Sequence, residues 1–433
     1  MDKRPTLPYR QPVHALICPG PLACLRPGLA EGWRILASWE RVGWRPARLA
    51  RRPAPGKPVG WAALDHQLDG RSQLGSPFDS LERAADSGHP WIGALSYELA
   101  CSEAGLPHQD PEAGSLGLCW RRLTQALHVD GGKSEIWSWD GEPAQSSDDV
   151  QKCLAQACVL ERPQLGSLSP RWNETTHHDA VETIRARILD GGFYVANLCV
   201  PFDAGWSGDA TTLALSSFRR ADPPFGALLP LGGLTLLSLS MERVLGKSGN
   251  ILVSEPIKGS VPRMGHAATD ELAGKAMRLD PKEISEHTMI VDLVRNDLGR
   301  VAEIGSVRVP DFMALHAYPT VQHLVSRVEA EARPNAGLAE ILRAMLPGGS
   351  VTGAPKHAVC AHIAGVEAAP RGFYCGALGW IHRGDFELAL PIRTAQLFDG
   401  RLVYWAGGGI TLRSDATKEW QELHLKTQVM GQS

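Results

Sequence analysis

Short apolar runs separated by turn residues dominate the chain and predict more β-strands than helices. They include WIGALSYELA near residue 95 and, later, FYVANLCVPF, FELALPIRTAQLF and RLVYWAGG. Apolar runs of this length, bounded by Gly, Pro and polar turn residues, are typical of strands. Residues 225–239 hold two such runs, and we expect a buried hairpin there. Because neighbouring runs adjoin as hairpins, the pattern indicates an α+β chain built on antiparallel sheets, and not a doubly wound parallel sheet.

Several segments have the spacing of amphipathic helices. The clearest begins near Thr176, with Thr175 or Thr176 as its N-cap, and ends at Gly191 and Gly192. Other helices are predicted over 280–296, over 336–345 and from about Ser414, and a short helical pattern runs to Leu160.

Two polar stretches, GEPAQSSDD and ERPQLGSLSPRWNETT, interrupt the apolar runs and mark a boundary between subdomains. We therefore expect an N-terminal region over residues 1–165 and a second domain over residues 175–430. A chain of 433 residues is long enough for one large or two ordinary domains.

Composition and charge narrow the function classes. With 43% hydrophobic and 21% charged residues, the chain has the composition of a soluble globular protein. The net charge of −3 provides no field that would gather a nucleic acid, and the basic stretch 45–52 is Pro-interrupted and reads as a solvated loop. No apolar segment is long and uninterrupted enough to predict a secretory signal or a membrane span. The nine Cys are scattered without a CxxC pair, which is typical of a reducing cytoplasm.

A carboxylate lies on the apolar face of the helix predicted over 280–296. Glu286 shares that face with Met289, Ile290 and Leu293. Burying a carboxylate without a partner costs on the order of several kcal/mol of folding free energy. A buried Glu286 therefore needs a cation, a metal or a proton. A carboxylate at the rim of the core, satisfied by an Arg or by water, is the alternative.

The C-terminal helix places Glu419, Glu422 and Lys426 on one stripe. Two carboxylates one turn apart suit a hard cation such as Mg2+, which prefers a few carboxylates together with water and substrate oxygens. An ordinary ion pair between Glu422 and Lys426 on a surface helix explains the same spacing.

Three glycine loops, PIKGS, PGGSVTGAPK and AGGGI, let backbone N–H groups approach an anion closely. None matches a phosphate-binding loop or a dinucleotide fingerprint, so a nucleotide is not indicated. Each loop alone is also consistent with a tight turn. Together with Arg393 and Lys426, they suggest a ligand rich in carboxylates.

The order of nine short motifs resembles the chorismate-utilising enzymes, a family that includes the component I subunits of anthranilate synthase and aminodeoxychorismate synthase. The motifs are SMER, EPIKGS, SEHTMIVDLVRNDLGR, VQHLVS, PGGSVTGAPK, FYCGALGW, PIRTAQL, AGGGI and EWQEL. The resemblance runs from about Thr176 to the C-terminus, whereas the N-terminal third matches mainly at WIGALSYELA. It implies a large antiparallel β-sandwich core flanked by helices, with residues 175–430 as the chorismate-binding catalytic domain.

Within this family the residue at position 258 discriminates between activities. Aminodeoxychorismate synthases have Pro-Ile-Lys-Gly-Thr, and this chain has the same motif with Lys258 and with Ser260 in place of Thr. The resemblance implies that Lys258 attacks C2 of chorismate as the C4 hydroxyl leaves, and that ammonia then enters at C4. The product would be 4-amino-4-deoxychorismate, a precursor of 4-aminobenzoate and folate. A lysine beside a glycine is otherwise usually just exposed.

The resemblance also implies roles for residues around the substrate. Glu242 matches the general acid, and His323 matches a histidine near the reacting ring, although a structural role for His323 is also open. Glu286 and Glu422 match the Mg2+ ligands, with Glu419 in support. The groups that would hold the two substrate carboxylates are Arg393, Lys426, Thr352, Ser260 and the backbone of Gly408 and Gly409.

The chain departs from the family pattern at three positions. Gly192 and Val195 stand where Asp and Gln are usual, and Met241 replaces a Pro. None of the nine Cys is flanked by Gly two residues away on both sides, as a glutaminase nucleophile would be. We therefore expect ammonia from a separate glutamine amidotransferase subunit or from solution.

Two other functions are consistent with these residues. The first is another chorismate aminase, such as anthranilate synthase component I, which Lys258 disfavours. The second is a catalytically silent chorismate-binding subunit, which the joint presence of Lys258, Glu242, Glu286 and Glu422 disfavours.

Overall fold

The computed structural model describes most of the chain from residue 76 onward. The described residues are 16–17, 36–37, 63–64, 76–111, 117–122, 125–130, 133–138, 162–231 and 234–430. The basic stretch 45–52, the polar break after residue 140 and the helical pattern that ends at Leu160 lie outside these residues.

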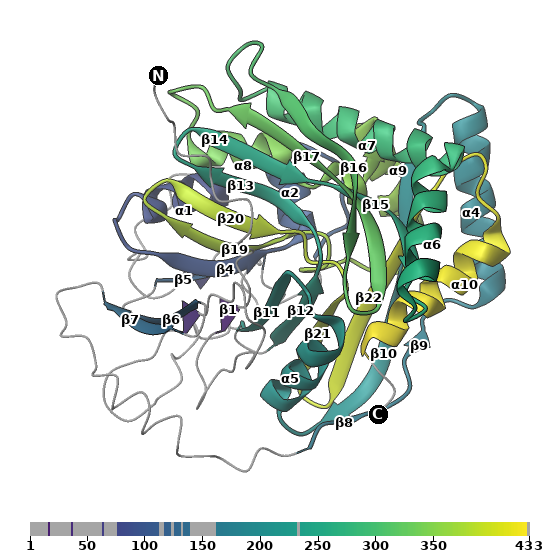
Figure 1. Cartoon of the computed structure of the whole chain (residues 1–433), viewed down its shortest axis with the longest axis horizontal. Helices are drawn as coiled ribbons and strands as arrows, with labels where there is room; N and C mark the ends of the chain where they lie inside the picture. The colour runs from purple at the N-terminus through teal and green to yellow at the C-terminus, as the bar shows by residue number, and fades with distance from the viewer. Residues whose placement is uncertain are drawn as a thin grey trace.

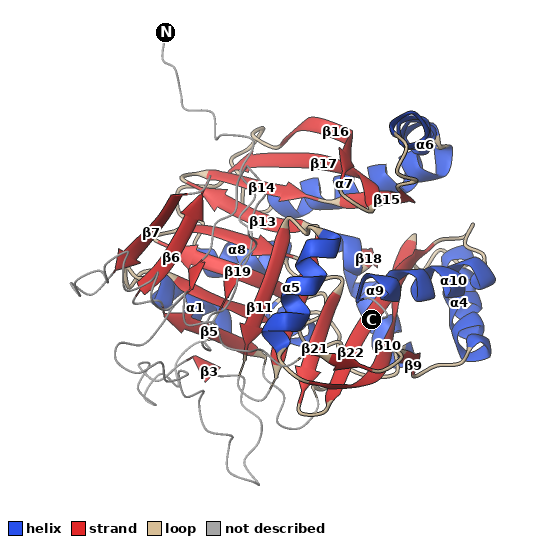
Figure 2. Ribbon diagram, turned by 60° about the horizontal axis from the view of Figure 1, so that its bottom comes forward, coloured by secondary structure: helices blue, strands red, loops and turns tan. Residues whose placement is uncertain are grey.

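Two ten-stranded sheets form the body of the protein (Figures 1 and 2). The first sheet has the order β18-β10-β22-β21-β12-β11-β1-β2, with β8 and β9 also paired to β10. Its strands are β1 (Leu16–Ile17), β2 (Leu36–Ala37), β8 (Gln164–Leu165), β9 (Ser169–Pro170), β10 (Val195–Ser207), β11 (Phe225–Pro230), β12 (Thr235–Ser240), β18 (Gly353–Ala354), β21 (Thr394–Phe398) and β22 (Arg401–Ile410).

The second sheet has the order β15-β17-β14-β13-β20-β19-β4-β5-β3, with β16 paired to β17. Its strands are β3 (Ala63–Leu64), β4 (Trp91–Leu95), β5 (Leu118–Arg122), β13 (Arg243–Ser248), β14 (Ile251–Glu255), β15 (Ile257–Pro262), β16 (Arg308–Ala317), β17 (Val321–Glu331), β19 (Ala377–His382) and β20 (Asp385–Ala389). A separate hairpin joins β6 (Gln125–Asp130) to β7 (Lys133–Ser138).

Antiparallel pairing dominates the described ladders, as the adjoining apolar runs predict. β11 and β12 pair from Phe225 with Ser240 to Pro230 with Thr235, which confirms the hairpin expected over 225–239. Only the two-residue pairings β1–β11, β1–β2 and β3–β5 are parallel among the described strands. The α+β class is therefore confirmed.

Helices pack around and between the sheets (Figure 2). They are α1 (Pro77–Ala85), α2 (Tyr97–Glu103), α4 (Glu174–Leu189), α5 (Ala210–Ala221), α6 (Ala267–Leu279), α7 (Pro281–Gly299), α8 (Leu338–Met345), α9 (Lys356–Val366) and α10 (Ala416–Thr427). Among the described helices, none is both long enough and apolar enough to span a membrane.

Two of the predicted helix starts are wrong by a few residues. α4 begins at Glu174, two residues earlier than predicted, because Asn173 caps it by accepting a hydrogen bond from the Thr176 amide over 2.8 Å. Asn is at least as good an N-cap as Thr, so the helix begins after Asn173 and not at the threonines. α10 begins at Ala416, two residues later than the predicted start at about Ser414. Its N-cap is Asp415, which accepts a hydrogen bond from the Lys418 amide.

One large apolar core joins the two sheets. It contains Leu198 from the first sheet, Leu245 from the second, and Phe78 from α1, all at most 1% exposed. β4 pairs with β19, and β3, β4 and β5 all belong to the second sheet, so the N-terminal region contributes three strands to a sheet whose other strands come from later residues. The boundary predicted between residues 165 and 175 stays a prediction.

Candidate active site

A β-bulge at Gly259 places Lys258 and Ser260. On β17, Leu324 pairs with Lys258 and the next partner, His323, pairs with Ser260, so Gly259 is the extra residue on β15. Gly259 has φ of +78°, a conformation that glycine adopts without strain. A Cβ at this position would also lie 3.0 Å from Glu283 Oε2, so the bulge packs tightly against α7.

The Lys258 amine lies against the glycines of β22. A Cβ built on Gly409 would stand 2.8 Å from Lys258 Nζ, so the absence of a side chain there makes room for the amine. The positive charge of Lys258 counteracts the rise in the pKa of Glu242 and lowers the pKa of Glu422. The amine therefore lies within electrostatic reach of carboxylates from both sides of the site.

Glu242 is a buried carboxyl group with the properties of an acid near neutral pH. It is 5% exposed, and burial raises its pKa to about 7, against the opposing effects of a hydrogen bond from Ser350 and of the Lys258 charge. Ser350 Oγ donates to Glu242 Oε1 over 2.6 Å. A carboxyl group with a pKa near the working pH is suited to proton transfer. Met241, which departs from the family pattern, is itself buried.

Both ring nitrogens of His323 are engaged. Arg393 Nη2 donates to Nε2 over 3.1 Å, so Nε2 is unprotonated and Nδ1 carries the hydrogen. Nδ1 lies 2.8 Å from Ser260 Oγ and donates to it. Burial, followed by the Arg393 charge, lowers the pKa of His323 to about 3. His323 is therefore neutral, and its contacts orient Arg393 and Ser260.

Arg393 presents a guanidinium group without a carboxylate partner among the described residues. It adopts φ of +50° in the turn between β20 and β21. Its described side-chain hydrogen bond goes to His323, a neutral group. A partly buried guanidinium with this environment is prepared to bind an anion.

The open edge of β22 presents the backbone amide of Gly409. Gly408 and Gly409 pair with Leu198 and Asn197 on β10, while the ladder to β21 ends at Tyr404. The Asn197 amide donates to the Thr352 carbonyl, away from β22, so the N–H of its partner Gly409 points to the unpaired edge. Gly408 alternates with it and uses its amide inside the ladder.

The backbone of Gly408 and Gly409, predicted to hold a substrate carboxylate, does not form the curled anion-binding conformation called a nest. Gly408 and Gly409 are both in extended strand and neither has positive φ, whereas a nest needs alternating backbone conformations. Gly407 contributes its carbonyl to the same edge and accepts a hydrogen bond from Lys426 Nζ over 2.6 Å. Lys426 is thereby held beside the Gly409 amide.

The carboxylates of α10 lie next to these glycines. Glu419 is 8% exposed, and its Oε2 would be 3.0 Å from a Cβ on Gly408. Burial raises the pKa of Glu419, and the charge of Glu422 raises it further. Glu422 forms the ion pair with Lys426 over 2.8 Å that its spacing also allowed, and its pKa is lowered by that lysine.

Glu286 on α7 carries an unsatisfied oxygen. Its Oε1 is buried without a hydrogen-bond partner, and Lys282 Nζ is 3.8 Å away. The Lys282 charge opposes the rise in the pKa of Glu419 and adds to the lowering of the pKa of Glu422 by Lys426, so the start of α7 faces α10. Glu286 is thus the carboxylate aimed into the fold that the helical spacing predicted.

These residues suit a hard cation, although they do not form a complete set of ligands. No three His, Cys, Asp or Glu side chains of the described residues form a group that could hold a metal ion. Mg2+ commonly takes one or two carboxylates and completes its shell with water and substrate oxygens. The orphaned oxygen of Glu286 and the facing carboxylates of α10 fit that requirement.

Thr352 is placed inside its own loop. It is completely buried, and its hydroxyl donates to the Gly348 carbonyl over 2.9 Å. Arg371, which sequence reasoning missed, holds the same loop from behind: its Nη1 donates to the Val351 carbonyl over 2.8 Å. The hydroxyl of Thr352 therefore stabilises the loop.

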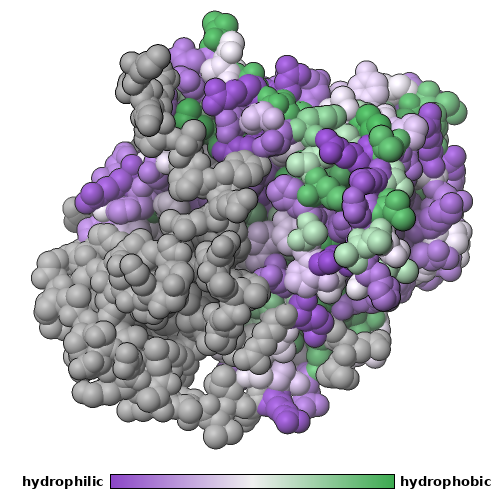
Figure 3. Space-filling model, viewed as in Figure 1, coloured by the Kyte–Doolittle hydropathy of each residue, from purple (hydrophilic) through white to green (hydrophobic). Residues whose placement is uncertain are grey.

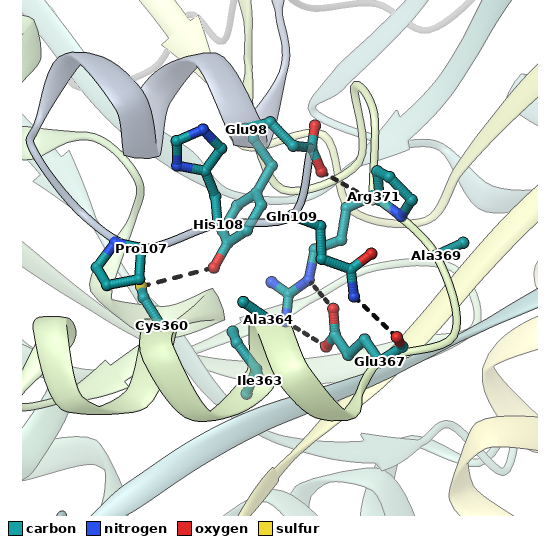
Figure 4. A pocket seen from close by; sticks show the side chains of 12 residues that line it. Glu98, Pro107, His108, Gln109, Cys360, Ile363, Ala364, Glu367, Ala369 and Arg371 are labelled. Atoms are coloured by element: carbon teal, nitrogen blue, oxygen red, sulfur yellow. Dashed lines mark hydrogen bonds and ion pairs between the residues drawn. The ribbon is translucent and has the colours of Figure 1, made fainter. Parts of the chain in front are cut away.

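Arg371 lies in a small pocket between α2 and α9 (Figure 4). It is 1% exposed and pairs with Glu367 over 2.7 Å, while Glu98 accepts from its backbone N–H over 2.6 Å. An Arg within the apolar stretch AAPRGFYCGALGW was the available signal for this network. Ser350 was also missed, because one hydroxyl in a Gly-rich loop is an ordinary feature.

A comparison with protein families gives the family of the chain. A family model described as chorismate binding enzyme matches residues 46–432. The chain belongs to the chorismate binding enzymes. The family resemblance of the nine motifs is therefore confirmed.

Curated relatives include members with different activities. Aminodeoxychorismate synthase component 1 from Klebsiella aerogenes is 39% identical over 339 residues, 76% of this chain and 74% of that protein. Anthranilate synthase component 1 1 from Haloarcula marismortui is 30% identical over 381 residues, 86% of this chain and 74% of that protein. The chain spans about half the length of others, such as 48% of the aminodeoxychorismate synthase from Streptomyces griseus, at 34% identity over 78% of this chain.

Solved structures confirm the fold. Anthranilate synthase component I from Streptococcus pneumoniae TIGR4 matches with a TM-score of 0.71 at 26% identity, covering 82% of this chain and 85% of that chain. The menaquinone-specific isochorismate synthase from Escherichia coli matches with a TM-score of 0.66 at 17% identity, covering 83% of each chain. The α+β fold of the chorismate-utilising enzymes is thus established.

Proposed function

We propose that this protein is an aminodeoxychorismate synthase component I, which converts chorismate and ammonia to 4-amino-4-deoxychorismate. The observation that carries the proposal is the position of the Lys258 amine, beside Gly409 and within electrostatic reach of Glu242. Relatives that bear this name, at 37 to 39% identity, support the same activity.

In the first step Lys258 acts as the nucleophile and Glu242 acts as the general acid. The neutral amine of Lys258 attacks C2 of chorismate, and Glu242 protonates the C4 hydroxyl as it leaves. Ammonia then adds at C4 and expels the lysine. The buried position and raised pKa of Glu242 support its role, because part of the population carries a proton near pH 7.

The carboxylates of chorismate are held by groups that lack a strong partner of their own. Arg393, oriented by His323, offers a guanidinium group, and the Gly409 amide on the open edge of β22 offers a second donor. Lys426 and Ser260 flank these donors. In this account Gly408 and Thr352 shape the walls of the site, and Gly409 donates from the backbone.

Glu286 and Glu422 would hold Mg2+, with Glu419 in support. A bound Mg2+ ion supplies positive charge that binds a substrate carboxylate and polarises its oxygens. Oε1 of Glu286, which is buried without a hydrogen-bond partner, supports this assignment.

Ammonia would come from a glutaminase subunit or, in the assay tube, from an ammonium salt. Relatives named component 1 support a partner. Figure 3 shows hydrophobic residues on the surface over α6, which Figure 1 labels in the same view. The exposed side chains there are Met264 (66%), Leu272 (69%) and Leu279 (75%). Such exposed apolar side chains are suited to a protein contact.

Product identity tests the proposal. The protein is incubated with chorismate, Mg2+ and an ammonium salt, and an aminodeoxychorismate lyase is then added. We expect 4-aminobenzoate, and we expect its loss in Lys258→Ala but not in the control Lys247→Ala, which changes a half-buried lysine on β13 that donates to the Gly384 carbonyl. Anthranilate as the main product would instead establish an anthranilate synthase.

A silent chorismate-binding subunit is the second alternative. It predicts that a complex with the partner keeps its activity when Lys258 is replaced by Ala. The raised pKa of buried Glu242 disfavours a silent site, because an unused buried carboxyl group only destabilises the fold.

A further inference from the structure

Ser350 restrains one oxygen of the Glu242 carboxyl group. The backbone of Glu242 is fixed separately: its N–H donates to Ser240 Oγ over 3.2 Å, and its carbonyl accepts from the Leu390 amide over 3.0 Å. The Glu242 side chain can still rotate about its torsion angles, and this rotation would turn the carboxyl group. The hydrogen bond of 2.6 Å from Ser350 Oγ to Oε1 restricts that rotation.

The loop that carries Ser350 is itself held by the protein. Arg371 donates to the Val351 carbonyl from the buried side. Gly349 packs against α7 so closely that a Cβ there would lie 2.5 Å from Leu293 Cδ2. The position of the Ser350 hydroxyl is therefore set by the scaffold before any ligand binds.

We propose that Ser350 is a positioning residue that makes Oε2 of Glu242 the oxygen from which the proton passes to the departing hydroxyl group. This inference rests on the proposed function. A protonated carboxyl group carries its hydrogen on one oxygen, and Oε1 is occupied as the acceptor of the Ser350 hydroxyl. The proton is therefore carried by Oε2, and the carboxyl group has the same orientation each time chorismate binds.

The same hydrogen bond becomes stronger as the reaction proceeds. Lys258 Nζ forms a C–N bond with the ring, the C4–O bond breaks, and the hydroxyl leaves as water with the proton from Oε2. The lysine nitrogen becomes positive and Glu242 becomes a carboxylate, so charge is conserved. A hydrogen bond to a charged acceptor is about twice as strong as one to a neutral acceptor, so Ser350 stabilises the transition state more than the ground state.

Few other charged groups interact with the Glu242 carboxyl group. Before the reaction, the charge of protonated Lys258 acts on Glu242, and this charge is gone once the amine has lost its proton and attacks the ring. The neighbouring Arg243 guanidinium is engaged by Glu255 and Glu387. Because the Ser350 hydroxyl favours the carboxylate form, removing it should raise the pKa of Glu242 by about one to two units.

The test uses the full chain with Ser350→Ala and Ser350→Thr. The infrared carbonyl stretch of the protonated carboxyl group is followed against pH and assigned by its absence in Glu242→Gln. Turnover with chorismate and an ammonium salt is measured on the same samples. We expect Ser350→Ala to raise the titration midpoint by about one to two pH units and to lower kcat about 10- to 100-fold. Ser350→Thr, which keeps the hydroxyl, should restore both.

An unchanged midpoint in folded Ser350→Ala would overturn the proposal, even if turnover falls, because a structural role alone lowers turnover without moving the titration. If Ser350→Ala does not fold, Ser350→Cys replaces it, and its weak donor should give a smaller rise; no rise overturns the proposal. Identification of the product in each sample keeps the two proposals apart. A product other than 4-amino-4-deoxychorismate contradicts the proposed function, whereas the titration tests the Ser350 hydrogen bond by itself.

Discussion

Replacing Gly409 by Ala tests the position of the nucleophile with a single methyl group. The new Cβ would lie 2.8 Å from Lys258 Nζ and 3.7 Å from Val195 Cγ2. The second distance is ordinary contact, but the first is too short, so the amine must move. Because the amine is the end of a flexible side chain and Gly409 has no positive φ, the backbone of β22 has no reason to change.

The expected effect is large on activity and small on stability. A displacement of about 1 Å of a reacting group costs on the order of 100-fold in rate, equivalent to about 2.7 kcal/mol of transition-state stabilisation. The free energy of unfolding should change by less than about 1 kcal/mol, since Ala suits a strand at least as well as Gly. The Gly409 amide is retained, so KM for chorismate should change much less than kcat.

Steady-state turnover with an ammonium salt and urea unfolding measure the two effects. Gly365→Ala is the matched control, because that glycine lies on α9 and an added Cβ meets nothing within 4 Å. The control should keep the activity of the unsubstituted protein. Unreduced turnover in Gly409→Ala would refute the placement of Lys258 as the attacking group.

Three further substitutions test other parts of the account. Arg371→Met should cost about 3 to 5 kcal/mol in urea unfolding, because it leaves Glu367 buried and unpaired, and an unchanged midpoint would show that the pair is not buried in solution. Glu286→Gln should weaken Mg2+ binding in calorimetry by at least about 10-fold, and unchanged binding would exclude Glu286 as a ligand. Glu242→Gln should stabilise the protein above pH 7 by up to about 3 kcal/mol, since the folded pKa is about 7 and the ordinary value 4.5, with the gain shrinking as pH falls from 7 to 4.5. A pH-independent difference between Glu242→Gln and the unsubstituted protein would contradict the raised pKa.

The class of fold could be predicted because its evidence is local. Apolar runs bounded by turn residues define strands, and the close pair over 225–239 becomes a hairpin by adjacency alone. The order of the sheets could not be predicted in this way. β4 pairs with β19, almost 300 residues later in the chain, and no local pattern encodes such a partner.

The candidate site was predicted as a set of residues but not as a geometry. Glu286 was found because helical spacing aims it inward, whereas Lys258, Glu242 and Arg393 were assigned through family motifs. The state of His323 depends on a hydrogen bond from Arg393, 70 residues away in sequence, so its neutral form could not be anticipated.

The glycines of β22 show the limit most directly. AGGGI suggested backbone N–H groups that approach an anion together, but pairing with β10 keeps the backbone extended and turns alternate amides, including that of Gly409, to the open edge. Strand pairing is a tertiary property, so the glycine run alone could not distinguish the two arrangements. The lack of side chains at Gly408 and Gly409 instead makes room for Glu419 and Lys258.

Mass spectrometry of the protein mixed with chorismate and Mg2+, without ammonia, tests the central claim most directly. The account predicts an adduct on the peptide that contains Lys258, with the added mass of chorismate less one water, and its discharge when an ammonium salt is added. Lys258→Ala should show no adduct, and Lys247→Ala should show the same adduct as the unsubstituted protein. Formation of 4-amino-4-deoxychorismate by Lys258→Ala at the normal rate, with no adduct on the unsubstituted protein, would contradict it.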